Sequence, residues 1–217
     1  MKNYKIIEDY LEELFKDPKC ELNYFNDYSL LIAIMLSAQT TDKRVNEVTQ
    51  VLFNKNDSLD KLKNANIKDL EKIIYPLGNY KRKAYNVKEI ARILNEEYSG
   101  IVPSDRNILE TFPGVGRKTV NVFYVEYLNI PAIAVDTHVE RVCKRLKLAK
   151  SSDNVLEIEK KLMKNIKKEN WSKRHLQLVL FGRYFCKAKK PECVTCKLKE
   201  ICDYNRRIYG KESKLSK

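Results

Sequence analysis

The chain has 217 residues, 43% of them apolar and 33% charged, which is enough for one large domain or two small ones with a real core. Lysine and arginine exceed aspartate and glutamate by 42 − 29 = 13, which favours a polyanionic partner such as nucleic acid, although a lysine-rich proteome with no such partner is the alternative. The N-terminal segment has no uninterrupted apolar run, and no window approaches about 18 apolar residues. We therefore expect neither a signal peptide nor a membrane span, and a cytosolic protein with reduced thiols.

Apolar residues at helical spacing predict a chain built from helices. The predicted helices cover residues 4–15, 29–37, 43–53, two short segments within 57–75, 81–97, 105–112, 118–128, 136–148, 153–166 and 172–185. Convincing period-2 alternation appears nowhere, so the predicted class is all-α. Asp27, Asp42 and either Ser104 or Asp105 are the predicted N-caps. The basic tail from Lys211 is expected to be disordered.

Residues 29–37 (YSLLIAIML) are apolar almost all round, which predicts a helix buried at the centre of the fold. Polar residues follow at once, from Ser37 to Asp42. A polar loop after a buried helix either lines a cleft or is a plain capped turn. The spacing by itself favours the plain turn.

Four of the six cysteines lie within seventeen residues near the C-terminus and can converge on one metal centre. Zinc usually takes two close pairs of cysteines, whereas an iron–sulfur cluster accepts other spacings. The spacing therefore favours a cluster but leaves zinc open. The pattern is C-x6-C-x2-C-x5-C, formed by Cys186, Cys193, Cys196 and Cys202.

The segment between the first two of these cysteines carries Lys187, Lys189 and Lys190. A metal would fix the shape of this loop, so its lysines either contact phosphates or form a solvated charge run. Cys20 stands alone and is expected to be a partly buried thiol with no further role.

A helix–hairpin–helix pattern surrounds Pro113-Gly114-Val115-Gly116. Gly114 and Gly116 can take positive φ and let a phosphate come close. The N–H groups that begin the second helix have no intrahelical partner and point, with the positive end of the helix dipole, at that phosphate. Arg117 and Lys118 follow directly. Contacts between backbone amides and phosphates read no base sequence.

Four motifs, in this order and spacing, resemble the endonuclease III family, the bifunctional branch of the helix–hairpin–helix DNA glycosylases. They are LSAQTTD (36–42), FPGVGRKTVNV (112–122), IAVDTHVERVC (133–143) and the cysteine pattern. The resemblance covers roughly residues 1–208. It implies two helical domains flanking a DNA-binding cleft. One is a six-helix barrel, residues 23–130, with the helix–hairpin–helix at about 105–128. The other is a [4Fe-4S] cluster domain formed by 1–22 and 131–217.

The resemblance also implies the catalytic pair. Lys118 matches the lysine that attacks C1′ of the damaged nucleotide, and Asp136 matches the aspartate that helps to deprotonate it and stabilises the cationic sugar. An amine must be neutral to attack, and the positive end of a helix lowers its pKa, as partial burial would. Asp136 is equally a good N-cap, and both roles can hold together. His138 either lines the active site or is structural, whereas His175 is expected to be structural.

By the same resemblance, Gln39 enters the gap left by the flipped-out nucleotide. The family usually places an apolar wedge in the turn that corresponds to residues 77–80, but this chain has Asn79 there. Either Leu77 substitutes as the wedge, or Asn79 hydrogen-bonds to the orphaned base. The remaining predicted DNA contacts are Gly114, Gly116, Arg117, Lys189 and Lys190.

The implied activity is base-excision repair. A DNA glycosylase with AP lyase activity would remove oxidised pyrimidines from duplex DNA through a lysine Schiff base and cut the strand by β-elimination. Its cluster would be structural or DNA-sensing. The expected partner is double-stranded DNA with a damaged base or an abasic site, bound by a monomer at the nucleoid.

The alternatives are a monofunctional mismatch-type glycosylase, whose branches lack a lysine at position 118, and a non-catalytic DNA-binding iron–sulfur protein. A phosphodiester hydrolase would need a carboxylate cluster for Mg²⁺, which the motifs do not contain.

Overall fold

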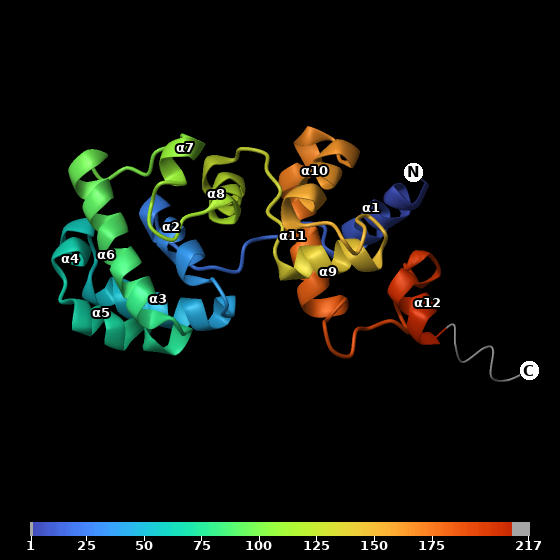
Figure 1. Cartoon of the computed structure of the whole chain (residues 1–217), viewed down its shortest axis with the longest axis horizontal. Coiled ribbons are helices and arrows are strands. Elements are labelled where there is room, and N and C mark those ends of the chain that lie inside the picture. The colour runs from blue at the N-terminus through green and yellow to red at the C-terminus, as the bar shows by residue number, and fades with distance from the viewer. Residues whose placement is uncertain (1, 210–217) are drawn as a thin grey trace, which may run out of the picture. The chain divides into compact units, whose positions relative to one another are not determined.

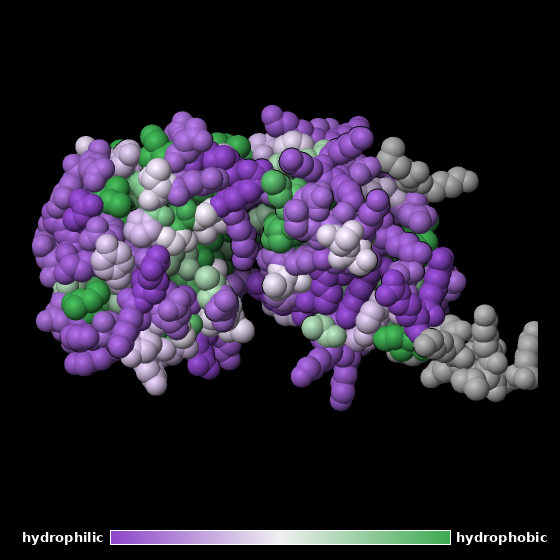
Figure 2. Space-filling view, in the orientation of Figure 1, coloured by the Kyte–Doolittle hydropathy of each residue, from purple (hydrophilic) through white to green (hydrophobic). Residues whose placement is uncertain are grey.

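The computed structural model describes residues 2–209, and every regular element within them is helical (Figure 1). The predicted all-α class is therefore confirmed. The basic tail from Lys211 lies outside the described residues. None of the helices described is long and apolar enough to cross a bilayer. Figure 2 shows a face dominated by hydrophilic residues with scattered apolar ones, as expected of a chain with 33% charged residues.

The chain divides into two compact units. The central unit is Cys20–Asn129, and the terminal unit combines Met1–Lys19 with Ile130–Lys217. Each has its own hydrophobic core. The predicted domain boundaries, after residues 22 and 130, lie close to these divisions. That these units are a six-helix barrel domain and a [4Fe-4S] cluster domain stays a prediction.

The central unit is organised around α2 (Asp27–Leu36), in which every residue after Asp27 is buried. This confirms the prediction of a buried central helix. Helices α3, α6 and α8 pack against α2. The helices of this unit other than α2 are α3 (Asp42–Lys55), α4 (Leu59–Asn64), α5 (Ile67–Ile74), α6 (Tyr80–Glu97), α7 (Arg106–Leu109) and α8 (Arg117–Phe123). A 3-10 turn, Tyr75–Leu77, links α5 to α6, and a π-helical turn, Tyr124–Leu128, follows α8.

The terminal unit brings the two ends of the chain together. Its helices are α1 (Lys2–Leu14), α9 (Thr137–Arg145), α10 (Val155–Asn165), α11 (Trp171–Leu180) and α12 (Asp203–Tyr209). A π-helical turn, Phe181–Phe185, extends α11, and short 3-10 turns lie at Lys168–Asn170 and Lys199–Ile201. Helix α11 packs against both α1 and α9.

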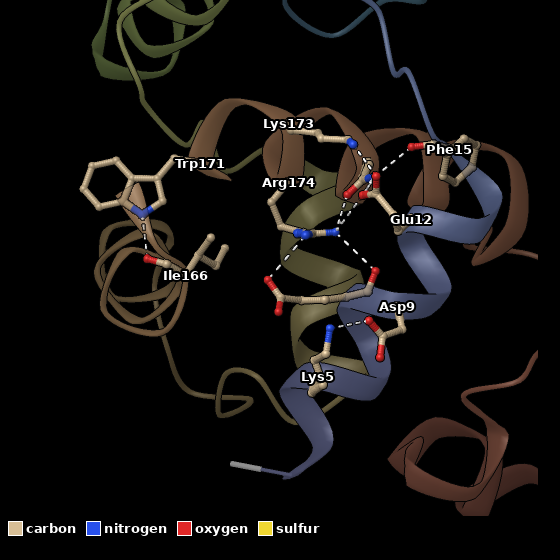
Figure 3. A network of polar contacts seen from close by, with 10 residues as sticks. Lys5, Asp9, Glu12, Phe15, Ile166, Trp171, Lys173 and Arg174 are labelled. Atoms are coloured by element: carbon tan, nitrogen blue, oxygen red, sulfur yellow. Dashed lines mark hydrogen bonds and ion pairs between the residues drawn. The ribbon is translucent and has the colours of Figure 1, made fainter. Parts of the chain in front are cut away.

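A partly buried polar network joins α1 to α11 (Figure 3). The side chain of Arg174 is only 9% exposed and forms an ion pair with Glu8 across 3.4 Å. Gln177 donates to the Glu12 carboxylate at 2.9 Å and to the Phe15 carbonyl at 2.7 Å. Lys173 also pairs with Glu12. Buried charges need such partners, so this network fixes the position of the N-terminal helix on α11.

The predicted caps are partly wrong. Asn26 caps α2 instead of Asp27: its side chain accepts from the Ser29 N–H, and the Ser29 hydroxyl accepts from the Asn26 N–H, both at 3.0 Å. Asn26 has the extended backbone that a cap needs, whereas Asp27 is already helical. The Asp27 carboxylate instead accepts from the Val102 N–H at 2.8 Å and so ties the loop after α6 to α2.

Four further helix predictions need correction. Thr41 caps α3 in place of Asp42, because it is the extended residue before the first turn. The helix predicted over 105–112 ends at Leu109, although its cap is Asp105 as predicted. The helices predicted to reach residues 128 and 185 end in π-helical turns, and α12 was not predicted.

Candidate functional site

The hairpin between α7 and α8 is a tight turn closed by a hydrogen bond from the Val115 N–H to the Phe112 carbonyl at 3.0 Å. Gly114 has the predicted positive φ, +79°, but Gly116 is extended at −113°, so that part of the prediction is wrong. Gly116 is the N-cap of α8 and offers no side-chain acceptor to the first turn. The N–H groups of this turn are therefore not capped by the residue before them, as an anion site requires.

Gly114 is also required by packing. A Cβ atom there would lie 2.4 Å from Nδ2 of Asn86 and 3.1 Å from Cγ of Met35. The hairpin thus rests directly on α6, which carries Asn86, and on α2, which carries Met35. Because Asn86 is only 5% exposed, the hairpin has little room to shift.

Lys118 is the second residue of α8 and is exposed. Its place in the first turn, at the positive end of the helix dipole, is as predicted. The side chain of Lys118 is not partly buried. Arg117 precedes it and is exposed as well.

Gln39 and Asn79 share an unusual backbone. Both are exposed, and both have positive φ, +60° for Gln39 and +46° for Asn79. A non-glycine residue in this region costs roughly 1–2 kcal/mol, less for Asn because its side chain bonds locally. Such strain is concentrated at functional sites. The backbone at Gln39 therefore favours the alternative in which the loop after α2 lines a cleft.

Leu77 is not available as a wedge. It is 3% exposed and belongs to the core of the central unit. The exposed residues around it are instead Tyr75, Pro76, Gly78 and Asn79. The tyrosine ring packs against the ring of Tyr80 with centroids 5.0 Å apart. Of the two predicted alternatives, the geometry favours Asn79.

Asp136 is the N-cap of α9 in the terminal unit. Its Oδ1 accepts from the N–H groups of His138 and Val139, both at 2.8 Å. Its Oδ2 lies 3.1 Å from Nδ1 of His138. The capping role predicted for Asp136 is therefore confirmed, and it holds the carboxylate in one orientation. His138 is in turn packed against Gly182, where a Cβ would lie 2.8 Å from the histidine Cβ.

The four clustered cysteines line one pocket in the terminal unit, with Leu146, Phe181 and Phe185 among its apolar walls. None of the cysteines forms a disulfide. Within residues 2–209, no three His, Cys, Asp or Glu side chains form a group that could hold a single metal ion. What the structure supports is four thiols around a common apolar pocket, a donor set suited to a thiolate-bound centre.

Two arginines of α9, which were not among the predicted site residues, contact the first of these cysteines. Arg145 donates to Sγ of Cys186 at 3.3 Å and to the Lys187 carbonyl at 2.8 Å, while its guanidinium stacks on the ring of Tyr204 at 3.8 Å. Arg141 donates to the Cys186 carbonyl at 3.0 Å. Burial raises the pKa of the Cys186 thiol, and Arg145 opposes that rise. The signal was present as two arginines four residues apart in HVERVCKR, which places both on one helix face.

Lys189 and Lys190 are exposed on the loop between the first two cysteines, as predicted. Lys190 has a positive φ of +50°. The loop is held by a hydrogen bond from the Glu192 N–H to the Phe185 carbonyl at 3.0 Å and by an ion pair between Lys187 and Glu192 at 3.0 Å. Lys187 is thus engaged within the loop, which leaves the other two lysines as the better candidates for phosphate contacts.

Comparison with known proteins agrees with these features. Residues 32–168 match the HhH-GPD superfamily of base excision DNA repair proteins. Endonuclease III of Bacillus subtilis (strain 168) is 44% identical over 205 residues, which cover 93% of this chain and 94% of the relative.

Two solved structures share this fold at 44% identity. A non-covalent endonuclease III–DNA complex has a TM-score of 0.92 and covers 95% of this chain and 96% of that one. A trapped covalent endonuclease III–DNA intermediate has a TM-score of 0.91, with coverage of 95% and 98%. The chain belongs to the endonuclease III family within the HhH-GPD superfamily. It is therefore a base-excision DNA repair enzyme.

Proposed function

We propose that the protein is a bifunctional DNA glycosylase and AP lyase that acts on oxidised pyrimidines in double-stranded DNA, with Lys118 as its nucleophile. Family membership supports the activity, because a relative at 44% identity has been trapped as a covalent enzyme–DNA intermediate. The observation that carries the assignment to Lys118 is its exposed position in the first turn of α8, directly after the hairpin.

The reaction begins when the damaged nucleotide leaves the base stack. The neutral amine of Lys118 forms a bond to C1′, the glycosidic bond breaks, and the base departs with its electron pair and gains a proton. Opening of the sugar ring converts the adduct to a Schiff base. Loss of a proton from C2′ then breaks the C3′–O bond and cuts the strand on the 3′ side. Water releases the lysine.

Asp136 supplies the carboxylate of this reaction. Its Oδ1 is occupied by two backbone N–H groups, so its orientation is set before DNA binds. A negative charge held in this way stabilises the cationic sugar and helps to take up the proton of the amine. His138, 3.1 Å from Oδ2, supports the same orientation.

We assign DNA contacts to exposed elements of the central unit. The N–H groups at the start of α8, with Gly114, Gly116 and Arg117, bind phosphate. Gln39 and Asn79, both exposed and left-handed, enter the gap left by the flipped nucleotide. In the terminal unit, Lys189 and Lys190 add phosphate contacts.

Cys186, Cys193, Cys196 and Cys202 hold a [4Fe-4S] cluster. Family membership and the shared apolar pocket of the four thiols support this choice. The bound cluster supplies no reaction step and serves as a cross-link that orders residues 186–202. Iron and sulfide analysis checks it: about four irons per chain are expected, whereas zinc would contradict the cluster. We place the protein at the nucleoid in the cytoplasm, where its substrate lies.

Borohydride trapping on a duplex with a single abasic site tests the proposal. Borohydride reduces a Schiff base to a stable amine, so cluster-loaded wild type should form a covalent adduct and Lys118→Ala should form none. Asp136→Asn keeps an N-cap acceptor but loses the charge, so we expect an unchanged fold and trapping slowed roughly 100-fold or more.

An adduct that persists in Lys118→Ala would show that another amine attacks. No adduct from wild type that still binds the duplex would leave a monofunctional glycosylase or a DNA-binding protein. Base release from a thymine-glycol duplex separates these two.

A further inference from the structure

Lys83 is a buried lysine on the second turn of α6. Its side chain is almost entirely enclosed, with 5% of the residue exposed. Its Nζ donates to the Ala38 carbonyl at 2.8 Å and to the Leu77 carbonyl at 3.0 Å. No carboxylate in the described part of the chain forms an ion pair with it. A buried ammonium without a carboxylate is rare and depends on every acceptor that it has.

The two carbonyls belong to different loops. Ala38 directly precedes Gln39 in the loop after α2, and Leu77 lies two residues before Asn79 in the turn before α6. Gln39 and Asn79 are the two exposed, left-handed residues assigned above to the DNA gap. The Lys83 ammonium therefore hydrogen-bonds to the backbone next to Gln39 and to the backbone near Asn79. These two residues are forty positions apart in the chain.

We propose that Lys83 is a positioning residue that holds Gln39 and Asn79 at a fixed mutual spacing for insertion into the gap left by a flipped nucleotide. This inference rests on the proposed function of these two loops. If either loop moved away, the ammonium would lose an acceptor while still excluded from water, so burial makes the contact costly to break. Loops ordered in advance lose less conformational entropy when DNA binds.

Lys88, also on α6, provides a matched comparison. Its Nζ donates to the Ala65 carbonyl at 2.6 Å, and its side chain is partly buried. It thus stabilises a loop backbone in the same way as Lys83. That loop, between α4 and α5, carries no predicted DNA contact. Lys88→Met reproduces the loss of a lysine-to-carbonyl bond without touching the proposed site.

The binding test compares wild type, Lys83→Met, Lys83→Arg and Lys88→Met, all as cluster-loaded proteins. The affinity of each protein is measured for two duplexes. One contains a tetrahydrofuran abasic analogue opposite 2-aminopurine, and the other is the matching undamaged duplex. We expect Lys83→Met to weaken binding to the abasic duplex about tenfold or more and to reduce the 2-aminopurine signal of gap filling, while binding to the undamaged duplex changes less than about twofold. Lys83→Arg, which keeps charged donors, should recover most of the preference, and Lys88→Met should keep all of it.

A positioning role predicts non-additivity. In a Gln39→Ala/Asn79→Ala background, Lys83→Met should weaken binding to the abasic duplex by less than about twofold, because the side chains that it positions are gone. A full tenfold loss in that background would overturn the proposal, as would Lys83→Met behaving like Lys88→Met in the wild-type background.

Hydrogen exchange of the proteins without DNA tests whether Lys83 joins the two loops through its hydrogen bonds to Ala38 and Leu77, an arrangement we call the bridge. Lys83→Met should accelerate exchange in peptides covering both residues 37–41 and 75–79, whereas Lys88→Met should affect only the segment around Ala65. If Lys83→Met does not fold, Lys83→Gln, whose neutral amide nitrogen stands one bond closer to the backbone than Nζ, carries the same comparisons. Unchanged exchange in both loops would overturn the bridge. A wild type with no preference for the abasic duplex and no trapped adduct would instead overturn the proposed function, and the exchange data would still decide whether Lys83 joins the loops.

Discussion

The carboxyl group of Glu126 is partly removed from solvent. It lies in the π-helical turn after α8, is partly buried, and its Oε1 has no hydrogen-bond partner among residues 2–209. Burial raises its pKa from 4.5 to about 7. Below pH 4.5 the group is neutral in the folded and unfolded states alike. Between about pH 4.5 and 7 the folded state holds the extra proton, so the stability associated with Glu126 falls as the pH rises through this window.

Glu126→Gln should therefore remove this part of the pH dependence. At pH 8 the variant should be more stable than wild type by on the order of 1 kcal/mol, a value already reduced because the side chain is partly exposed. Near pH 5 the two proteins should have similar stability. Thermal unfolding of both proteins between pH 5 and 8 measures the difference. A difference that stays constant over this range would mean that Glu126 is not the titrating group.

Among the helices, α9 has residues of proposed functional importance at both of its ends. Asp136 caps its N-terminus, and Arg141 and Arg145 in its last two turns hold the backbone around Cys186. Arg145 also contacts the sulfur itself, at 3.3 Å. One helix thus orients the proposed catalytic carboxylate and the first cysteine of the proposed cluster. Hydrogen bonds donated to metal-binding residues orient these ligands and strengthen metal binding.

Arg145→Met should weaken the hold on the cluster, because it removes the donor to the sulfur and to the loop carbonyls. We expect iron to be lost to a chelator about 10–100 times faster than from wild type. Lys144→Met is the control: Lys144 is the neighbouring residue on α9 and pairs with Glu140 at 2.7 Å. Equal rates of iron loss from the two variants would show that Arg145 has no special role at Cys186.

The molecule as a whole carries a net charge of +13, so its binding to any duplex should weaken steeply with salt. Each phosphate contact contributes about 0.9 to the slope of log K against log salt. If Lys189 and Lys190 both contact phosphates, replacing both with serine should lower the slope by about 1.8. The control replaces two exposed lysines of the same unit, Lys160 and Lys167. If the Lys160/Lys167 variant lowers the salt slope by the same amount, the change reflects net charge alone and not contacts of Lys189 and Lys190 with phosphates.

Local patterns were enough to predict most of the helices. The apolar run of α2 predicted its central burial. The cap at Asp136, and the choice of Ser104 or Asp105 at α7, followed from immediate neighbours, on which a cap depends. Errors arose where neighbouring residues compete. Asn26 and Thr41 displaced Asp27 and Asp42 as caps, since only the residue with extended backbone can fill that place.

The periodicity of the sequence by itself predicted the all-α class. Its four motifs supported the family through their resemblance to endonuclease III, and that resemblance assigned the residues of catalysis and of the cluster. Only the tertiary structure decided which side chains are accessible. It buried Leu77, left Lys118 and Asn79 exposed, and bent the backbone at Gln39. It alone brought Lys83 to the carbonyls of two distant loops. Long-range contacts of this kind depend on how helices pack, and helix packing is not encoded in the spacing of any one segment.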